Sequence, residues 1–373
     1  MQFIDLKSQF ERIEEDVCSR VDSVLRSQRY VMGPEITELE QQLAHYAGVK
    51  HVLSCSSGTD ALVIPLLTYS LTKTDAVFVP SFTFFASAES ITLAGGTPVF
   101  VDCDQTSFNM TAQCLEDAIN KVKAEGKLNP KGIIAVDLFG QPAEYDAIEN
   151  LARMHNLFLL EDTAQGFGGI YKGRKTGSFG DVAATSFFPA KPLGAYGDGG
   201  AIFTDDDDLA ELMRSVRVHG QGADKYDNVR IGINGRLDTI QAAILLSKLA
   251  IFDSEIEARN KVAARYTDLL SDVIKTPVVP ESMTSVWAQY TLVASCKQER
   301  ENIIAGLGAK DIPSAIYYPI PIHLSTAYAS LGYKMGDLPN CEYLAQRVFS
   351  LPMHPYLKDE EIEKIAQVVR ESM

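Results

Sequence analysis

The sequence predicts an α/β protein whose larger part is built on a doubly wound, mostly parallel sheet. Short apolar segments alternate with helical segments from His51 to Asp162, which is the pattern of strands connected by helices. Segment 132–138, GIIAVDL, is almost entirely apolar, as expected of a parallel strand that is covered on both faces. Ligands of such sheets bind at the carboxyl ends of the strands.

The composition is that of a globular protein and excludes several partners. The chain has 373 residues, of which 46% are hydrophobic, and this length suffices for two domains. The 34 Lys and Arg against 49 Asp and Glu give a net charge of −15, which argues against a nucleic-acid or anionic-membrane partner. We expect a cytoplasmic protein without a metal site, because no signal peptide, membrane-length apolar run or CxxC pair is present.

The elements of the first half follow from apolar spacing and from turn residues. A helix is predicted over 8–28, and a second begins at a capping box formed by Thr37 and Glu40 and ends at Gly48. Strands are expected at 51–55, 76–79, 98–102, 132–138 and 157–160. Helices are expected at 61–70, before Ala94, at 115–122 and at 146–155.

The second half contains a domain boundary. Four aspartates, 205–208, begin a helix that runs to Arg217. The amphipathic run 237–270 is too long for one compact helix, and Asp253-Ser254 is its predicted interruption. We therefore expect a large domain at 1–252 and a smaller α/β domain at 253–373, with strands at 287–294 and 314–318 and helices at 300–307 and 359–369.

A turn of small polar residues, SSGTD at 56–60, lies between the first strand and a helix. Free N–H groups at a helix start and the helix dipole together form an anion site. Gly58 would let a ligand approach the backbone closely, and Thr59 adds a hydroxyl. An ordinary helix cap in a strand–helix unit fits the same residues.

The stretch 185–204, TSFFPAKPLGAYGDGGAIFT, holds a single lysine, Lys191, between two expected strands. The Asp198-Gly199 pair is a hairpin signal, and AIFT is the expected returning strand. Apolar neighbours would lower the pKa of Lys191, because burial disfavours the ammonium, and a neutral amine is what imine chemistry requires. A surface lysine in a loop is the alternative.

Two further side chains follow strands of the expected sheet. Asp162 ends the strand at 157–160, where a buried carboxylate needs a partner, although a capping aspartate is the alternative. Phe84 follows the strand at 76–79 and is placed to stack on a flat ring, although such aromatics are more often core.

These groups are what pyridoxal 5′-phosphate (PLP) requires of a protein. A neutral lysine anchors the aldehyde, a carboxylate keeps the pyridine nitrogen protonated, an aromatic covers the ring, and a helix start holds the phosphate. The lysine would both anchor the cofactor and move the substrate proton.

Several long segments in order then resemble one family. These are SSGTDAL, PSFTFFASAE, LEDTAQGFG, SFFPAKPLGAYGDGGAIFT, GINGRLDTIQAAIL and YYPIPIH. Over nearly its whole length the chain is similar to the DegT/StrS-type sugar-nucleotide aminotransferases. The resemblance implies the aspartate-aminotransferase-like fold (PLP fold type I), with a large domain carrying a mostly parallel sheet and a smaller C-terminal α/β domain.

The resemblance also implies a set of cofactor residues, with pyridoxamine 5′-phosphate (PMP) as the reaction intermediate. Lys191 matches the lysine that bonds PLP, Asp162 the partner of the pyridine nitrogen, and Gln165 the contact of the ring hydroxyl. Phe84 matches the stacking residue. The remaining positions match phosphate ligands, of which the last reaches the cofactor of a neighbouring subunit and implies a homodimer with sites at its interface: Gly58, Thr59, Ser186 and Asn234.

Within the family, the chain looks most like enzymes that aminate UDP-2-acetamido-2-deoxy-3-oxo-glucuronate with L-glutamate, for surface polysaccharides such as lipopolysaccharide O-antigen. Arg236 and Tyr318 are the candidates for the sugar-nucleotide side, Arg236 because its planar fork suits a carboxylate. A structural ion pair and a core phenol are their alternatives. Tyr317 stands where those enzymes carry His, and Ser57 where many relatives carry Asn, so the exact sugar stays open.

Four other functions are compared with this one. The first alternative is an aminotransferase for a 4-keto-6-deoxy sugar nucleotide, and the second is a non-catalytic protein on the same fold. A related dehydratase would carry histidine in place of Lys191. A nicotinamide enzyme is disfavoured, because no GxGxxG follows a strand.

Overall fold

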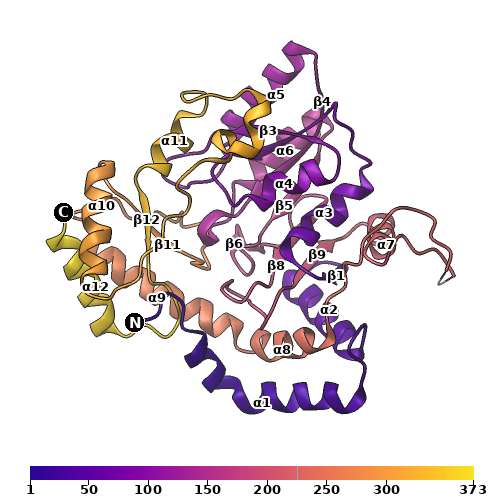
Figure 1. Cartoon of the computed structure of the whole chain (residues 1–373), viewed down its shortest axis with the longest axis horizontal. Helices are drawn as coiled ribbons and strands as arrows, with labels where there is room; N and C mark the ends of the chain where they lie inside the picture. The colour runs from indigo at the N-terminus through magenta and orange to yellow at the C-terminus, as the bar shows by residue number, and fades with distance from the viewer. Residues whose placement is uncertain (225) are drawn as a thin grey trace.

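The computed structural model describes residues 1–224 and 226–373, and a seven-stranded sheet forms its centre (Figure 1). The strand order is β1-β9-β8-β5-β4-β2-β3. Pairing is parallel from β3 through β2, β4 and β5 to β8, whereas β9 runs antiparallel to both β8 and β1. The predicted, mostly parallel sheet is confirmed. Its strands are β1 (His51–Cys55), β2 (Asp75–Pro80), β3 (Thr97–Val101), β4 (Asn129–Val136), β5 (Phe158–Asp162), β8 (Val182–Ser186) and β9 (Gly200–Thr204).

Helices cover both faces of this sheet, because successive residues of each strand point to opposite sides. In β4, Ile134 and Val136 pack in one cluster with α3 (Gly58–Thr68), α4 (Ala86–Leu93) and α7 (Asp207–Val216). The alternate residues Ile133 and Ala135 pack with α5 (Ala112–Glu125) and α6 (Tyr145–His155). The apolar segment GIIAVDL therefore reflects burial on both faces.

Helix α2 (Pro34–Ala47) starts earlier than the sequence predicted. Pro34 occupies the first turn after Gly33, where its missing N–H and fixed φ fit a helix start. The predicted capping box is therefore wrong, because Thr37 and Glu40 lie inside the helix. Glu40 instead accepts hydrogen bonds from the backbone N–H (2.8 Å) and hydroxyl (2.9 Å) of Ser54.

Three long helices lie along the lower edge in Figure 1. Helix α1 (Leu6–Ser27) packs against α8 (Thr239–Leu249) through a small cluster that includes Ile13, Val17 and Ile244. Helix α9 (Phe252–Leu270) follows, so the chain is interrupted at residues 250–251 and not at Asp253-Ser254. Asp253 belongs to the first turn of α9, where a carboxylate interacts favourably with the helix dipole.

A second core forms beside the large sheet. Strands β11 (Tyr290–Val293) and β12 (Val348–Leu351) pair antiparallel and pack with α9, α10 (Lys297–Gly308) and α12 (Asp359–Glu371). The expected strand at 314–318 is absent from this described region, where Ala315 makes only an isolated bridge to Ser350. Both termini lie on this side of the molecule (Figure 1).

The remaining elements are short. They are β6 (Ile170–Tyr171), β7 (Arg174–Lys175), β10 (Met283–Thr284), α11 (Pro339–Ala345) and three 3-10 turns, η1 (Leu138–Gly140), η2 (Ile322–Leu324) and η3 (Thr326–Leu331). Among the described helices, none combines the length and the apolar character that a membrane span requires.

Candidate active site

Lys191 lies on an irregular connection, residues 187–199, between β8 and β9. The two strands pair antiparallel as predicted, but the connection is longer than a hairpin turn. Backbone bonds hold its base, since Phe187 N–H donates to Gly199 (2.8 Å) and Ala195 N–H donates to Phe187 (2.7 Å). The lysine backbone is fixed by a bond from its N–H to the carbonyl of Phe188 (2.8 Å).

Asp162 faces Lys191 because β5 and β8 are neighbours in the sheet. Asp162 is aligned with Ala184 of β8, so both strands deliver their carboxyl ends to the same edge. Burial lowers the pKa of Lys191 and raises the pKa of Asp162, and the attraction between the two charges opposes both shifts. A carboxylate and an easily deprotonated amine therefore share one buried site.

Two donors from the protein support the charge of Asp162. The hydroxyl of Ser87, at the start of α4, donates to Oδ2 (2.7 Å), and the N–H of Ala164 donates to Oδ1 (3.2 Å). Both bonds lower the pKa of the carboxyl and so counteract burial. Ser87 was not predicted, although a serine within the apolar FFASAE segment that follows β2 was a signal for it.

An aromatic and amide group forms the next part of the site. The Nε2 of Gln165 donates to the hydroxyl of Tyr318 (3.0 Å), and its Oε1 accepts the N–H of Phe139 (2.8 Å). The ring of Tyr318 lies 6.2 Å from the ring of Phe84, which is 55% exposed and so presents an open face. Burial raises the pKa of Tyr318, which keeps its phenol protonated.

The start of α3 forms an anion cradle. Ser57 caps the helix, because its hydroxyl accepts the N–H of Asp60 (3.0 Å) and its carbonyl accepts the N–H of Ala61 (3.0 Å). Within the described residues, the N–H groups of Gly58 and Thr59 have no hydrogen-bond acceptor. These donors suit a phosphate.

Ser186, the last residue of β8, closes the other side of this cradle. A Cβ at position 58 would lie 2.5 Å from the Cβ of Ser186, so only glycine allows the strand end and the helix start to come this close. The cradle therefore combines two free N–H groups with the Ser186 hydroxyl, and these donors fit the phosphate of PLP.

Asn234 and Arg236 form a separate pair. Arg236 Nη2 donates to Asn234 Oδ1 (2.6 Å), and a backbone bridge joins Arg236 to Cys55 at the end of β1. In the described chain, no ion pair joins Arg236 to a carboxylate, so its guanidinium is available to an anion. No contact between described residues joins this pair to Lys191.

A buried pair of carboxyl groups lies behind the site and was not predicted. Asp137 accepts hydrogen bonds from the Tyr145 hydroxyl (2.7 Å) and the Ala143 N–H (2.9 Å), and Glu161 accepts the N–H groups of Gly177 and Phe179. Burial raises the pKa of both acids, that of Asp137 to about 6, and the charge of Asp137 raises the pKa of Glu161 further.

This pair predicts a pH dependence of stability. The folded state binds a proton on Asp137 more tightly than the unfolded state, whose pKa is about 3.8, so stability falls as pH rises from about 3.8 to about 6 and levels off above that. We expect Asp137→Asn to reduce that fall, measured as the free energy of unfolding in urea from about pH 4 to pH 7. Exposed Asp146→Asn is the matched control, and equal slopes for Asp137→Asn and the wild type would contradict the prediction.

Comparisons with known proteins identify the family of the chain. The model of the DegT/DnrJ/EryC1/StrS aminotransferase family matches residues 11–370. The chain is 45% identical over 366 residues to a Pseudomonas aeruginosa protein, the UDP-2-acetamido-2-deoxy-3-oxo-D-glucuronate aminotransferase, and the match covers 98% of each chain.

Solved structures show the same relationship. A crystal structure of a DegT DnrJ EryC1 StrS aminotransferase from Brucella abortus has a TM-score of 0.96 and 51% identity, covering 100% of this chain and 99% of that one. The PMP form of a Streptococcus pneumoniae protein assigned as a sugar aminotransferase has a TM-score of 0.88 and 27% identity, covering 96% of both chains. The chain therefore belongs to the DegT/DnrJ/EryC1/StrS aminotransferase family, whose members are PLP-dependent transaminases.

Proposed function

We propose that this aminotransferase moves the amino group of L-glutamate to the keto carbon of UDP-2-acetamido-2-deoxy-3-oxo-glucuronate. The observation that carries the proposal is the approach of the half-buried Lys191 to the buried Asp162 at the carboxyl edge of the sheet. The sugar is supported by the Pseudomonas aeruginosa relative, which is named for it. The product would serve the synthesis of bacterial surface polysaccharides.

The side chains present fit PLP. Lys191 would hold it covalently, Asp162 would face its pyridine nitrogen, and Gln165 its ring hydroxyl. Phe84 would cover one face of the ring with its exposed side. The phosphate would bind the cradle of Gly58, Thr59 and Ser186, which is supported by the two N–H groups without acceptors in the described chain. When bound, this cofactor supplies an electron sink for the amino-bearing carbon.

The protein itself contributes proton transfer and electrostatics. Because burial lowers its pKa, the amine of Lys191 loses its proton more easily, and it would take the proton from the carbon that loses the amino group and pass it to the cofactor. Asp162 stays ionised through its bonds to Ser87 and Ala164, and its charge favours a protonated ring nitrogen. Burial around Lys191 excludes water from the proton that is moved.

We also propose that the enzyme is a homodimer in which Asn234 reaches the cofactor phosphate of the neighbouring subunit. The exposed position of Asn234 supports this, as do Val229 and Ile231 on the preceding segment, which are 53% and 89% exposed. The division into domains at 1–252 and 253–373 is part of the same proposal, and the separate core that includes α10 and α12 supports it.

The first test is the visible absorption of the purified protein before and after L-glutamate. A band of lysine-bound cofactor that bleaches with glutamate supports the cofactor and the amino donor together. The cofactor-bound protein is then incubated with ¹⁵N-labelled glutamate as donor. One sample receives the 3-oxo-glucuronate nucleotide as acceptor, and a separate sample receives a 4-keto-6-deoxy sugar nucleotide. Label in the uronate product alone supports the proposal, and label in the deoxy sugar alone supports the alternative.

A non-catalytic protein on the same fold is the other alternative. Such a protein would gain nothing from a buried lysine and carboxylate, which are costly to hold without a ligand. A colourless protein that does not bind added PLP would favour this alternative and would overturn the proposed site.

Arg236→Ala should raise KM for the uronate nucleotide more than KM for a neutral keto sugar nucleotide. The guanidinium has no carboxylate partner among the described residues, and its planar fork suits a substrate carboxylate. We expect a ratio of about 10- to 100-fold between the two effects, since charged hydrogen bonds contribute about 1.5–3 kcal/mol. Arg236→Lys, which keeps the charge without the fork, is the control. Equal effects on both substrates would exclude the carboxylate role.

A further inference from the structure

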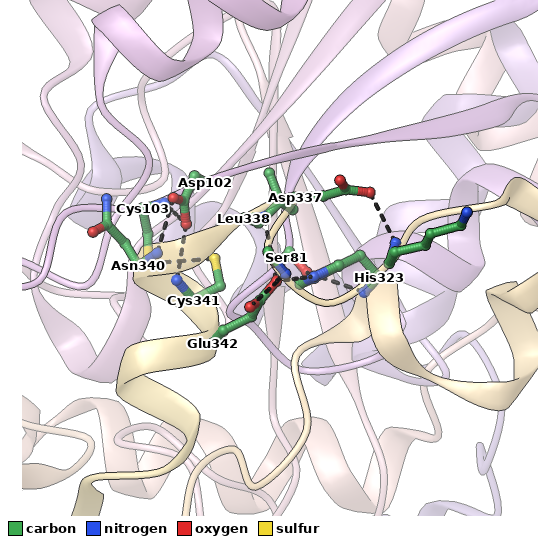
Figure 2. Close-up of polar contacts among 11 residues, drawn as sticks. Ser81, Asp102, Cys103, His323, Asp337, Leu338, Asn340, Cys341 and Glu342 are labelled. Carbon is green, nitrogen blue, oxygen red and sulfur yellow. Dashed lines mark hydrogen bonds and ion pairs between the residues drawn. The ribbon is translucent and has the colours of Figure 1, made fainter. Parts of the chain in front are cut away.

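Three buried side chains form a continuous hydrogen-bonded chain outside the groups described above (Figure 2). The Ser81 hydroxyl and the Nδ1 atom of His323 are 2.7 Å apart, and His323 Nε2 is 3.1 Å from Glu342 Oε1. The exposed fractions are 0% for Ser81, 1% for His323 and 9% for Glu342. The chain joins the end of β2 to η2 and α11, which are far apart in the sequence.

The contacts hold His323 at three atoms. The Ser81 oxygen accepts the backbone N–H of His323 (3.0 Å) and also lies against Nδ1 of its ring. On the other side of the ring, Nε2 lies against the carboxylate of Glu342. His323 is therefore tied both to the end of β2 and to α11.

Glu342 is itself anchored. Its carboxylate accepts the N–H of Gly336 through both oxygens (2.8 Å each). Asp102, at the end of β3, accepts the N–H groups of Asn340 (3.0 Å) and Cys341 (2.8 Å), which ties the start of α11 to the large sheet (Figure 2). The acceptor at the far end of the chain is thus fixed to the same sheet as Ser81.

The order of serine, histidine and acid is that of a hydrolytic triad, but the geometry excludes that role. Ser81 is fully buried, and its oxygen is occupied by the N–H of the histidine residue itself. A nucleophile must reach a substrate carbon, and this hydroxyl does not. The hydrogen-bonded series of Ser81, His323 and Glu342 therefore serves to hold together the protein segments around it.

Ser81 and His323 each lie a few residues along the sequence from an aromatic residue of the active site. Ser81 precedes Phe84 by three residues, and its carbonyl also accepts the N–H of Ile322 (2.9 Å). His323 follows Tyr318 by five residues, and Tyr318 contacts Gln165 and lies against Phe84. The contact thus closes the base of a loop whose two arms carry the aromatic residues of the site.

We propose that His323 is a positioning residue, which ties the segment 315–323 to the end of β2 and so fixes Tyr318 against Phe84 and Gln165. The inference rests on the proposed roles of Tyr318 and Phe84 in transamination. A histidine suits this place because its two ring nitrogens reach the Ser81 hydroxyl and the Glu342 carboxylate at the same time.

The first test needs no substrate. His323→Gln keeps a donor for Glu342 and loses the ring contact with Ser81, so hydrogen exchange of residues 315–323 should become about tenfold faster. Tyr266→Phe is the matched control, because it loses one buried hydrogen bond, to the Pro352 carbonyl (3.0 Å), within the second core. If residues 315–323 exchange no faster in His323→Gln than in Tyr266→Phe, the inference is overturned, whatever substrate the enzyme uses.

The second test is a double-mutant cycle with Tyr318→Phe in the PLP-loaded enzyme. Each single variant should lower kcat/KM for the keto sugar nucleotide by about 10- to 100-fold, since small displacements of a site residue cost this much. The kcat/KM of the double variant should be no lower than that of the more impaired single variant, because both changes disturb the same residue, Tyr318. If the fold-losses in kcat/KM of the two single variants multiply in the double variant, His323 has a merely structural role and the inference is overturned.

If His323→Gln does not fold, Ser81→Ala is put through the same two measurements, since it removes the same contact with less change in volume. A wild-type enzyme that aminates no keto sugar would reject the proposed function, and the exchange measurement would still decide whether His323 holds the segment.

Discussion

Replacing Lys191 by alanine should lower kcat by about 10²- to 10⁴-fold or more, the range that a positioned proton-transfer group contributes. Lys191 is the only lysine placed at Asp162 among the described contacts, and burial favours its neutral form. The loss should appear in both halves of the reaction, because the same amine would release the cofactor and move the proton. Single-turnover absorption measurements with L-glutamate follow the first half directly.

The matched control is Lys175→Ala. Lys175, the last residue of β7, pairs with Asp253 at 3.2 Å and lies over the ring of Tyr46, away from Lys191. We expect this variant to keep its turnover and the absorption of the bound cofactor. A Lys191→Ala enzyme with wild-type turnover would mean that another amine performs the chemistry.

Asp162→Asn should lower kcat by about 10²- to 10³-fold, the effect of removing one preorganised electrostatic contact. The amide keeps the size of the side chain and an acceptor for the N–H of Ala164, but it lacks the charge that would keep the ring nitrogen protonated. Binding of PLP should change much less, because the phosphate cradle and Lys191 remain. The measurement is kcat together with the affinity for PLP.

Ser87→Ala separates charge from packing in this experiment. It removes the 2.7 Å hydrogen bond that helps to ionise Asp162 while the carboxyl remains. We expect a smaller loss of kcat than in Asp162→Asn and a shift of the pH profile to higher pH, because the pKa of Asp162 rises further without this donor. Near-normal rates in Asp162→Asn would mean that a group other than Asp162 pairs with the pyridine nitrogen.

The parts of the fold that depend on local pattern could be predicted from the sequence. Apolar runs such as GIIAVDL gave the parallel strands, since burial on both faces leaves a mark within one short segment. Lys191 and Asp162 could be named because each follows a predicted strand. Their approach required the neighbouring positions of β5 and β8, which spacing alone does not state.

Features that depend on distant residues could not be predicted. Ser81 and His323 are 242 positions apart, and neither carries a local sign of its partner. Helix α2 shows the opposite error, since Thr37 and Glu40 have capping-box spacing, yet Pro34 starts the helix and Glu40 bonds Ser54. The capping-box spacing was a local signal, but the side chain of Glu40 makes a tertiary contact with Ser54 instead.

The strand order has a consequence for the order of events during synthesis. Strand β1 is the first strand to leave the ribosome, but its partner in the sheet is β9, and His51 pairs with Thr204. The first strand therefore waits for about 150 further residues before its ladder closes, and closing such long loops is slow. We expect fragments that end before residue 200 to keep this strand unpaired and prone to aggregation, so that a nascent chain must extend past β9 before its sheet is complete.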